Sequence, residues 1–289
     1  MFQLFTDTDC DMTPELCAEF GYKLISMPYA VDGKEVYPYE DFKTFDEHTF
    51  YEMLRGGVLP TTSAISTQNY INYFEPTFAE GKDILYVHFS AAMTNTFDFM
   101  HQALETLFKK YPERKFYEVD AKGITIAGLN VALSVGDLAK EGKTPEEIVE
   151  WAKTEVDKHA IFFTADDLKF FHHSGRVSGL SATMGTLLGI KPLMHMSSEG
   201  KMVSIGKEKG RRKAFQYMVN KMEELGEDVK NHRIIIGHSD NLDMAEELAE
   251  MIRAKFGEDT KITYAVVNPT AGSHCGPDGV GVAFYAIHR

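Results

Sequence analysis

Two groups of small polar residues, most of them with hydroxyls, each precede a candidate helix in the first third of the chain. Thr62 and Ser63 form one group, and Thr94, Asn95 and Thr96 form the other. Hydroxyls and free backbone N–H groups at a helix start bind anions, because the donors are unpaired and the helix dipole favours negative charge. The same residue types also act as ordinary helix caps, so either group alone leaves both interpretations open. Since both groups follow successive strands, we expect them to face one crevice.

Two glycine-punctuated segments in the second half each carry one basic side chain. The first runs from His172 to Gly179 and contains Arg176, and the second runs from Pro269 to Pro277 and contains His274. We expect both segments to be tight loops. A guanidinium fork or an imidazole suits recognition of a carboxylate or a phosphate. The pattern alone favours loop glycines beside a solvated arginine.

An acidic pair after the first predicted strand suggests a different chemistry. Asp7 and Asp9, separated by one residue, resemble the Asp-x-Asp of aspartyl-phosphate phosphatases, in which one carboxylate is a nucleophile beside magnesium. Those enzymes usually carry Thr or Val where Asp11 stands here. The nearest later acidic pair is Asp166-Asp167. A phosphatase is therefore the weaker alternative.

Other catalytic and metal-binding signatures do not match the sequence. The nearest approach to a Gly-x-Ser-x-Gly elbow, at residues 175–179, has the wrong spacing. His172 and His173 are adjacent and lack the spacing of a His-Glu-x-x-His zinc site. Neither a Walker A nor a dinucleotide-binding glycine fingerprint is present. We expect no catalytic residue, no metal and no cofactor.

The charge balance restricts the partners. The 289 residues include 30 basic and 43 acidic side chains, so the net charge is −13. An acidic chain without a basic run is a poor candidate for binding nucleic acid or an anionic membrane surface. The 14 methionines and 20 phenylalanines could line an apolar tunnel, although they also suit an ordinary core.

The apolar segments argue against membrane insertion. The longest, Ile124–Val135, is interrupted by Gly128, Asn130 and Ser134 and is far shorter than the ~20 residues that a membrane helix needs. No signal-type leader is visible at the start. The three cysteines show no paired spacing, as expected of reduced thiols. We therefore expect a cytoplasmic protein.

Strand-like and helix-like segments alternate in the first half. Such alternation predicts a mostly parallel sheet with helices on both faces. Lys23–Val31 is predicted as one strand, closed by an Asp32-Gly33 turn, and Thr13 and Thr144 are predicted helix caps. The other expected strands are Phe2–Phe5, Asp83–Phe89 and Lys115–Val119, and the expected helices are one near Pro14 and Phe45–Leu54, Asn69–Phe78, Phe97–Tyr111, Ile124–Glu141 and Glu146–His159.

The pattern changes near Ala160, and we predict an α/β protein of two domains. Residues 1–160 would form the parallel-sheet domain, and residues 161–289 an α+β domain with a mixed or antiparallel sheet. The expected strands of the second domain are Ala160–Thr164, Met202–Lys207, Arg233–His238, Lys261–Val267 and Val280–Ala286, and its expected helices are Gly210–Leu225 and Met244–Phe256.

Taken in order, these motifs resemble those of the DegV family over essentially the whole chain. The chain departs from the family pattern at Ala64, Ile65, Asn95, Ser174 and Asp278. The segments that carry the resemblance are Thr6–Asp9, Val31–Gly33, Tyr37, Thr62–Ser66, Met93–Phe97, Asp167–Val177, Ile190–Leu193, Gly200-Lys201, Arg211 with Ala214, and His274–Gly281.

The resemblance implies a bacterial protein that binds a long-chain fatty acid between its two domains. It also implies presentation of the acyl carboxylate to a separate fatty-acid kinase, as part of phospholipid metabolism. Arg176 and His274 match the functional arginine and histidine of that system. A lipid carrier or sensor without a kinase role is the alternative. The residues expected near the carboxylate are Thr62, Ser63, Thr94, Asn95, Thr96 and His274.

Overall fold

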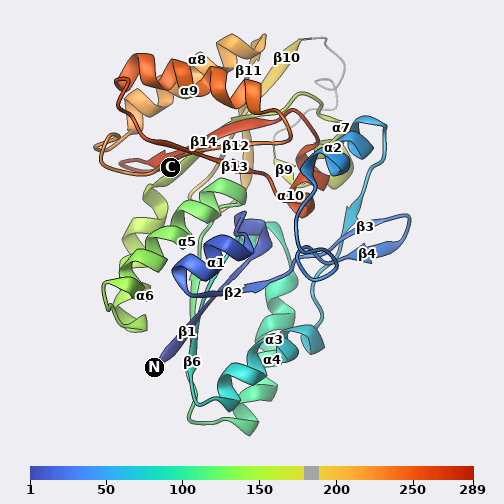
Figure 1. The fold of residues 1–289 in the computed structure, drawn as a ribbon, viewed down its shortest axis with the longest axis vertical. Helices are drawn as coiled ribbons and strands as arrows, with labels where there is room; N and C mark the ends of the chain where they lie inside the picture. The colour runs from blue at the N-terminus through green and yellow to red at the C-terminus, as the bar shows by residue number, and fades with distance from the viewer. Residues whose placement is uncertain (179–188) are drawn as a thin grey trace.

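The computed structural model describes residues 1–178 and 189–289, and its first sheet is fully parallel (Figure 1). The strand order is β2-β1-β6-β7, and each neighbouring pair runs in the same direction. Five of the six residues of β6 are buried, as expected of a strand covered on both faces. The strands are β1 (Phe2–Asp7), β2 (Tyr22–Ile25), β6 (Asp83–His88) and β7 (Phe116–Asp120).

Helices cover both faces of this sheet. On one face lie α3 (Thr67–Ala79) and α4 (Thr96–Lys110), and on the other lie α1 (Pro14–Phe20), α5 (Thr125–Lys140) and α6 (Pro145–Glu155). The predicted caps are confirmed. Thr13 accepts a hydrogen bond from the Leu16 N–H, and Thr144 forms a capping box with Glu147.

The second sheet is mixed. Its order is β13-β12-β14-β8-β10-β11-β9, in which β12–β13 and β9–β11 are parallel pairs and the other neighbours are antiparallel. The helices α8 (Arg211–Leu225) and α9 (Leu242–Phe256) cover its outer face (Figure 1). The predicted α/β fold class is confirmed. The strands are β8 (His159–Thr164), β9 (Val177–Ser178), β10 (Ile190–Met196), β11 (Met202–Lys209), β12 (Ile234–His238), β13 (Ile262–Val266) and β14 (Val280–Tyr285).

Helix α5 lies between the two sheets. It contacts β6 of the first sheet and β8, β12 and β14 of the second. Eleven of its 16 residues are buried, as expected of a helix packed between two layers. Gly128 permits the close approach, because an added Cβ would lie 2.8 Å from the Cys10 Sγ. This helix therefore couples the two halves of the chain.

A small third sheet joins the first half of the chain to the second. Its order is β4-β3-β5, formed by β3 (Tyr29–Val31), β4 (Lys34–Val36) and β5 (Thr61–Thr62). The predicted Asp32-Gly33 turn is confirmed, with φ of 51° and 75°. Tyr29 packs with α2 (Glu47–Arg55) and with Phe170 of α7 (Lys169–Ser174), and α2 also contacts α10 (Pro269–Cys275).

Two expectations about local structure are wrong. Lys23–Val31 is not one strand, because β2 ends at Ile25 in the first sheet and β3 begins at Tyr29 in the third. Between them Pro28 has no N–H to donate to a ladder, and the Met27 N–H donates to the Thr8 hydroxyl instead.

Of the two segments predicted as tight loops, the second is mostly helical, whereas in the first only residues 172–174 are helical and Gly175 and Arg176 lie outside any helix or strand. Ser174 ends α7, and His274 lies in the last turn of α10. Asn268 caps α10 and Pro269 occupies its first turn, a combination that favours a helix start. Gly179, the end of the first segment, lies outside the described residues.

The expected domain boundary lies where the chain enters the second sheet. The short helix η3 (Val156–Lys158) follows α6, and β8 begins at His159. The division into 1–160 and 161–289 stays a prediction, because α5 and the third sheet contact both halves. Within the described ranges, every helix is too short or too polar to cross a lipid bilayer.

Candidate functional site

A cavity lies between the carboxyl ends of the parallel strands and the face of the second sheet that contacts α5. It contains about 1060 Å³ of space free of protein atoms, including its open mouth. Asp9 follows β1, Phe89 follows β6, and Ile126 belongs to the first turn of α5. Ile161 and Phe163 of β8 line the opposite wall. Open parallel sheets generally bind ligands at this edge.

The walls of the cavity are mainly apolar. Met27, Met93 and Met202 contribute thioether side chains, and Ile124 and Phe171 add aliphatic and aromatic surface. Methionine side chains adapt to irregular shapes because they are unbranched and flexible. Pockets for small molecules commonly have mostly apolar walls and a few polar groups. Walls of this kind suit a long, flexible, apolar ligand.

A threonine and a histidine meet at the mouth of the cavity. The Thr62 Oγ1 lies 3.0 Å from the His274 Nε2, and both residues line the cavity. Burial, together with the positive charges of Arg176 and His173, lowers the pKa of His274 to about 4. The ring is therefore neutral at pH 7, with one donor nitrogen and one acceptor nitrogen.

Of the three residues Thr94, Asn95 and Thr96, two line the cavity and one lies at the surface. Thr94 and Thr96 line the cavity, and the Thr94 Oγ1 accepts a hydrogen bond of 3.1 Å from the Thr96 N–H. The Thr96 hydroxyl already bonds the Ile65 N–H at 3.0 Å and the Tyr70 hydroxyl at 3.2 Å. Asn95 is exposed and lines a neighbouring polar hollow rather than the cavity. The Thr94 hydroxyl therefore has fewer hydrogen-bond partners in the protein than the Thr96 hydroxyl and can more readily donate to a ligand.

The polar hollow adjoins the mouth and carries two basic side chains. Arg176 and Lys201 line it together with Thr94 and Asn95, and Arg176 and Thr94 also line the cavity. Arg176 is exposed, and its Nη1 donates to the Ser174 carbonyl at 2.6 Å. An anion at the mouth would meet the positive charge of this hollow.

Ser63 also lines the cavity, but its hydroxyl has a different partner. It is exposed and donates a hydrogen bond to the carboxylate of Glu35 on β4. The structure therefore brings Thr62, Ser63 and Thr94 to one cavity, as the sequence predicts. To bind a ligand anion, the Ser63 hydroxyl would first have to break its hydrogen bond to the Glu35 carboxylate.

Sequence reasoning missed the residues that hold His274 in place. The Asp11 Oδ1 accepts hydrogen bonds from the Asn268 backbone N–H at 2.9 Å and from its side-chain Nδ2 at 2.8 Å. The Thr270 hydroxyl donates to the Met27 carbonyl at 2.6 Å. These contacts attach α10 to the loops of the first sheet. The Asn-Pro pair at 268 and 269 was the available sequence signal for this helix.

The acidic residues after β1 are buried rather than open to solvent. Asp7 accepts hydrogen bonds from the Cys10 N–H at 3.1 Å, the Tyr86 hydroxyl at 2.9 Å and the Phe89 N–H at 3.1 Å. Burial raises the pKa of Asp7 to about 6. Since both carboxylate oxygens are occupied by interior donors, Asp7 is poorly placed to attack a phosphoester. Asp9 is the acidic residue of this turn that reaches the cavity.

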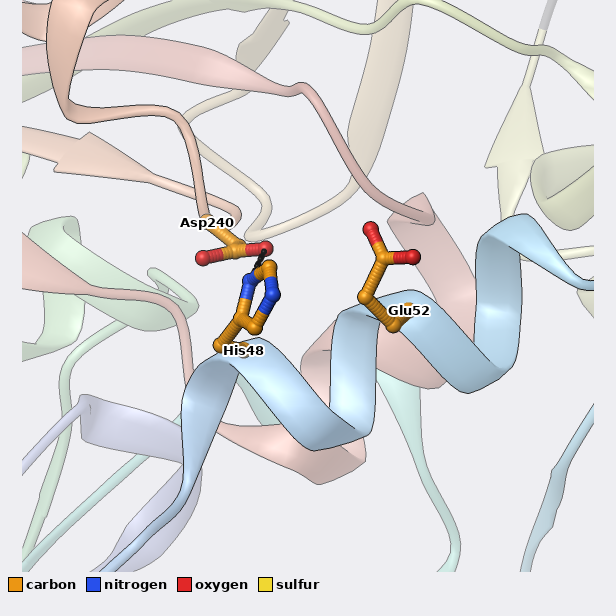
Figure 2. A group of neighbouring side chains, drawn as sticks. All are labelled: His48, Glu52 and Asp240. Atoms are coloured by element: carbon orange, nitrogen blue, oxygen red, sulfur yellow. Dashed lines mark hydrogen bonds and ion pairs between the residues drawn. The ribbon is translucent and has the colours of Figure 1, made fainter.

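Figure 2 shows a group of potential metal ligands formed by two residues of α2 and one residue that follows β12. None of the three lines the cavity. The donor atoms of His48, Glu52 and Asp240 lie within 4.8 Å of one another. However, the Arg55 Nη1 donates to both carboxylates, at 2.9 Å to Glu52 and 2.5 Å to Asp240. Because this guanidinium already occupies both carboxylates, we assign no metal here. His48 and Glu52 are one helical turn apart in sequence, whereas only folding brings Asp240 to them.

Comparison with known proteins gives a consistent result. The model of the DegV family, described as an uncharacterised protein family, matches residues 1–286. A DegV domain-containing protein of Clostridium perfringens is 30% identical over 284 residues, covering 98% of this chain and 97% of the relative.

Two solved structures share the fold. One is described as fatty acid binding of a DegV family protein from Thermus thermophilus, with a TM-score of 0.86, 22% identity and 99% of each chain covered. The other is a stearic-acid-binding protein from Eubacterium ventriosum, with a TM-score of 0.87, 18% identity and 99% of each chain covered. At these identities the likeness supports the fold alone.

Proposed function

This chain belongs to the DegV family, and from that premise we propose that it binds a long-chain fatty acid in the cavity between its two sheets. The observation that carries the proposal is one continuous cavity with apolar walls and a mouth of hydroxyl and imidazole groups. A fatty acid has the same division, with a long hydrocarbon chain and one anionic end. The solved relatives described as binding fatty acids support this ligand class.

The apolar walls supply most of the proposed affinity. Burying an acyl chain of about 16 carbons at ~0.8 kcal/mol per methylene gains on the order of 12 kcal/mol before the costs of association. Met27, Met93 and Met202 can adjust to the bends of such a chain. The carboxylate loses water on binding and therefore needs donors at the mouth.

We assign the carboxylate to the mouth, next to Thr62, Thr94 and His274. The Thr94 hydroxyl can donate one hydrogen bond, and the Thr62–His274 pair can donate a second. That second bond comes from the Thr62 hydroxyl when the His274 Nε2–H donates to Thr62, and from the ring Nδ1–H when Nε2 accepts from Thr62. A carboxylate beside His274 would raise its pKa, because an opposite charge favours the imidazolium form. We give Ser63, Asn95 and Thr96 supporting roles around this head group.

We further propose that the carboxylate is presented to a partner fatty-acid kinase, with phosphoryl transfer catalysed by that partner in the cytoplasm. The hollow next to the mouth supports this, because Arg176 and Lys201 provide positive charge where an acyl phosphate would form. A lipid carrier or sensor without a kinase role uses the same cavity and stays the alternative. A phosphatase based on Asp7 is disfavoured by the burial of that carboxylate.

Mass spectrometry of the purified protein tests the ligand. We expect a native mass that exceeds the denatured mass by one fatty acid, and extraction should identify that acid. A protein of unmodified mass that takes up no fatty acid on incubation would contradict the proposal.

Adding a fatty-acid kinase catalytic subunit and ATP to the loaded protein tests the partner. We expect acyl phosphate, trapped as a hydroxamate, and we expect its loss in Arg176→Ala while the bound lipid is retained. Lipid binding without any acyl phosphate would favour the carrier.

A further inference from the structure

The two cations of the polar hollow are neighbours on one wall. Strands β9 and β11 run parallel and pair Val177 with Met202, so the residues that precede these two, Arg176 and Lys201, lie next to each other. Neither cation forms an ion pair with another described residue, and the lining of the hollow contains no acidic side chain. Two adjacent positive charges repel each other, and an anion between them removes that repulsion.

The opposite wall of the hollow follows Ser90 in the chain. Residues 91–95 come directly after Ser90 and line that wall, whereas Lys201 comes directly after Gly200. The Ser90 Oγ donates a hydrogen bond of 2.6 Å to the Gly200 carbonyl, and both residues are buried. One hydrogen bond therefore joins the points at which the two walls begin.

The fit around Gly200 is close. Its φ is 77°, and a Cβ added there would overlap the Ser90 Oγ and lie 3.3 Å from the Lys122 Cα. The turn that carries Gly200 is closed by the Ser197 N–H, which donates to the Lys201 carbonyl at 2.9 Å, and by the Gly200 N–H, which donates to the Ser197 carbonyl at 2.8 Å. The turn is thus a compact unit that rests on Ser90 at one point.

No other polar contact holds this turn against the first sheet. Over the part of the chain that the structure describes, the Ser90–Gly200 bond is the one hydrogen bond between the β10–β11 hairpin and residues 1–155. The side chains by which the hairpin joins the core of the first sheet are those of Met194, Met196 and Met202. Methionine packing adapts to its surroundings and fixes positions poorly. The position of Lys201 relative to the opposite wall therefore depends on this one bond.

We propose that the Ser90–Gly200 contact positions the hollow to bind a phosphoryl group on the ligand head. Such a group meets Arg176 and Lys201 on one wall and Thr94 on the other. A phosphoryl group carries close to two negative charges and matches two cations better than a carboxylate does. Ser90 and Gly200 touch no ligand themselves and act through Lys201. The inference rests on the proposed binding of a fatty acid and its acyl phosphate, and it names the residues that position the phosphoryl subsite.

The test compares palmitic acid with hexadecylphosphonic acid, whose head is a stable substitute for that of an acyl phosphate. Dissociation constants are measured by displacement of a fluorescent fatty acid from delipidated protein. We expect Ser90→Ala to weaken phosphonate binding about tenfold, which corresponds to about 1.4 kcal/mol, and to leave palmitic acid within about twofold of wild type. If Ser90→Ala does not fold, Ser90→Cys provides a weaker donor for the same comparison.

The outcomes separate this inference from the function on which it rests. If the wild type binds palmitic acid but not the phosphonate, the inference is wrong while fatty-acid binding stands. The same conclusion follows if Ser90→Ala weakens both ligands equally, or neither. If the wild type binds neither ligand, the proposed function itself fails.

A double-mutant cycle then separates positioning from a general loss of packing. Lys201→Met should weaken phosphonate binding in the wild type by more than it does in Ser90→Ala, because Ser90 acts through Lys201. Additive effects would overturn the inference. Ser26→Ala is the control, because its buried hydroxyl also donates to a carbonyl, that of Pro38 at 2.7 Å, but lies outside the lining of the cavity and the hollow. It should leave the ratio of the two affinities unchanged.

Discussion

The Thr62 Oγ1 lies 3.0 Å from the His274 Nε2, although 212 residues separate them in the chain. Thr62 is held by β5, where it pairs with Tyr29, and His274 is held by the last turn of α10. The contact closes one side of the cavity mouth. Of the hydroxyl proton and the ring proton of this pair, one lies in the contact, so only the other can be donated to an incoming carboxylate.

Removing two hydroxyls at the mouth should weaken fatty-acid binding. We expect Thr62→Val with Thr94→Val to raise the dissociation constant by at least about a hundredfold, since each hydrogen bond to a charged group is worth roughly 1.5–3 kcal/mol. Displacement of a fluorescent fatty acid measures this. Thr61→Val is the matched control, because Thr61 is exposed and outside the cavity lining. Unchanged affinity in the double variant would exclude the assigned head-group site.

Enlarging one side chain of the wall should shorten the bound acyl chains. Ala271 lines the cavity from α10 and is only partly buried, so the added atoms of Ala271→Leu can extend into free space. Each methylene excluded from the cavity loses ~0.8 kcal/mol. We expect the acids extracted from the variant to be shorter than those from the wild type. The control is Ala254→Leu on the exposed side of α9, which should give the same distribution of fatty-acid chain lengths as the wild type. If Ala271→Leu also gave the wild-type chain lengths, the acyl chain would not lie against Ala271.

Arg55 should stabilise the contact between α2 and the second half of the chain. Its guanidinium donates to the Asp278 carboxylate at 2.8 Å and to the Asp240 carbonyl at 3.0 Å, in addition to the Asp240 carboxylate. We expect Arg55→Met to lower the free energy of unfolding by about 1–3 kcal/mol, the cost of leaving buried or half-buried acceptors unpaired. Urea denaturation measures the loss.

The control for Arg55 is an exposed ion pair. Lys255→Met breaks only the pair between Lys255 and Glu223, and such pairs are typically worth less than about 1 kcal/mol. Equal losses in the two variants would show that Arg55 acts as an ordinary surface charge. Added salt should weaken the effect of Lys255→Met more, because exposed charges are screened more strongly.

Asp11→Asn should change how stability depends on pH. Burial raises the pKa of Asp11 to about 7 in the folded protein, whereas an unperturbed aspartate has a pKa of about 3.9. Between these values the folded state keeps a proton on Asp11 that the unfolded state has lost, so the contribution of Asp11 to wild-type stability falls as pH rises from about 4 to 7. The asparagine stays neutral and retains an oxygen for Asn268. We therefore expect the stability of the variant relative to wild type to increase over this range, as measured by urea denaturation at both ends. Parallel profiles would contradict the assigned pKa.

The sequence by itself determined most elements and their class, because those signals are local. Thr13 and Thr144 cap helices as predicted, and the Asp32-Gly33 turn forms its hairpin. Caps and turns depend on φ, ψ and hydrogen bonds within a few residues, so the sequence contains the information directly. The ordered motifs also identified the family. Asn268-Pro269 contained the same kind of signal for α10, and it was overlooked.

Only the tertiary structure decided how distant elements meet. It separated Lys23–Val31 into strands of two different sheets. It also placed α5 between the first sheet, whose strands precede this helix in the chain, and the second sheet, whose strands follow it. It also brought Thr164 of β8 to the cavity that Asp9 reaches from β1. Such contacts depend on which surfaces of the whole chain can be buried together, and that balance of packing free energy is not contained in any one segment. The sequence therefore determined the kinds of residues available for binding, and folding decided which of them share one cavity.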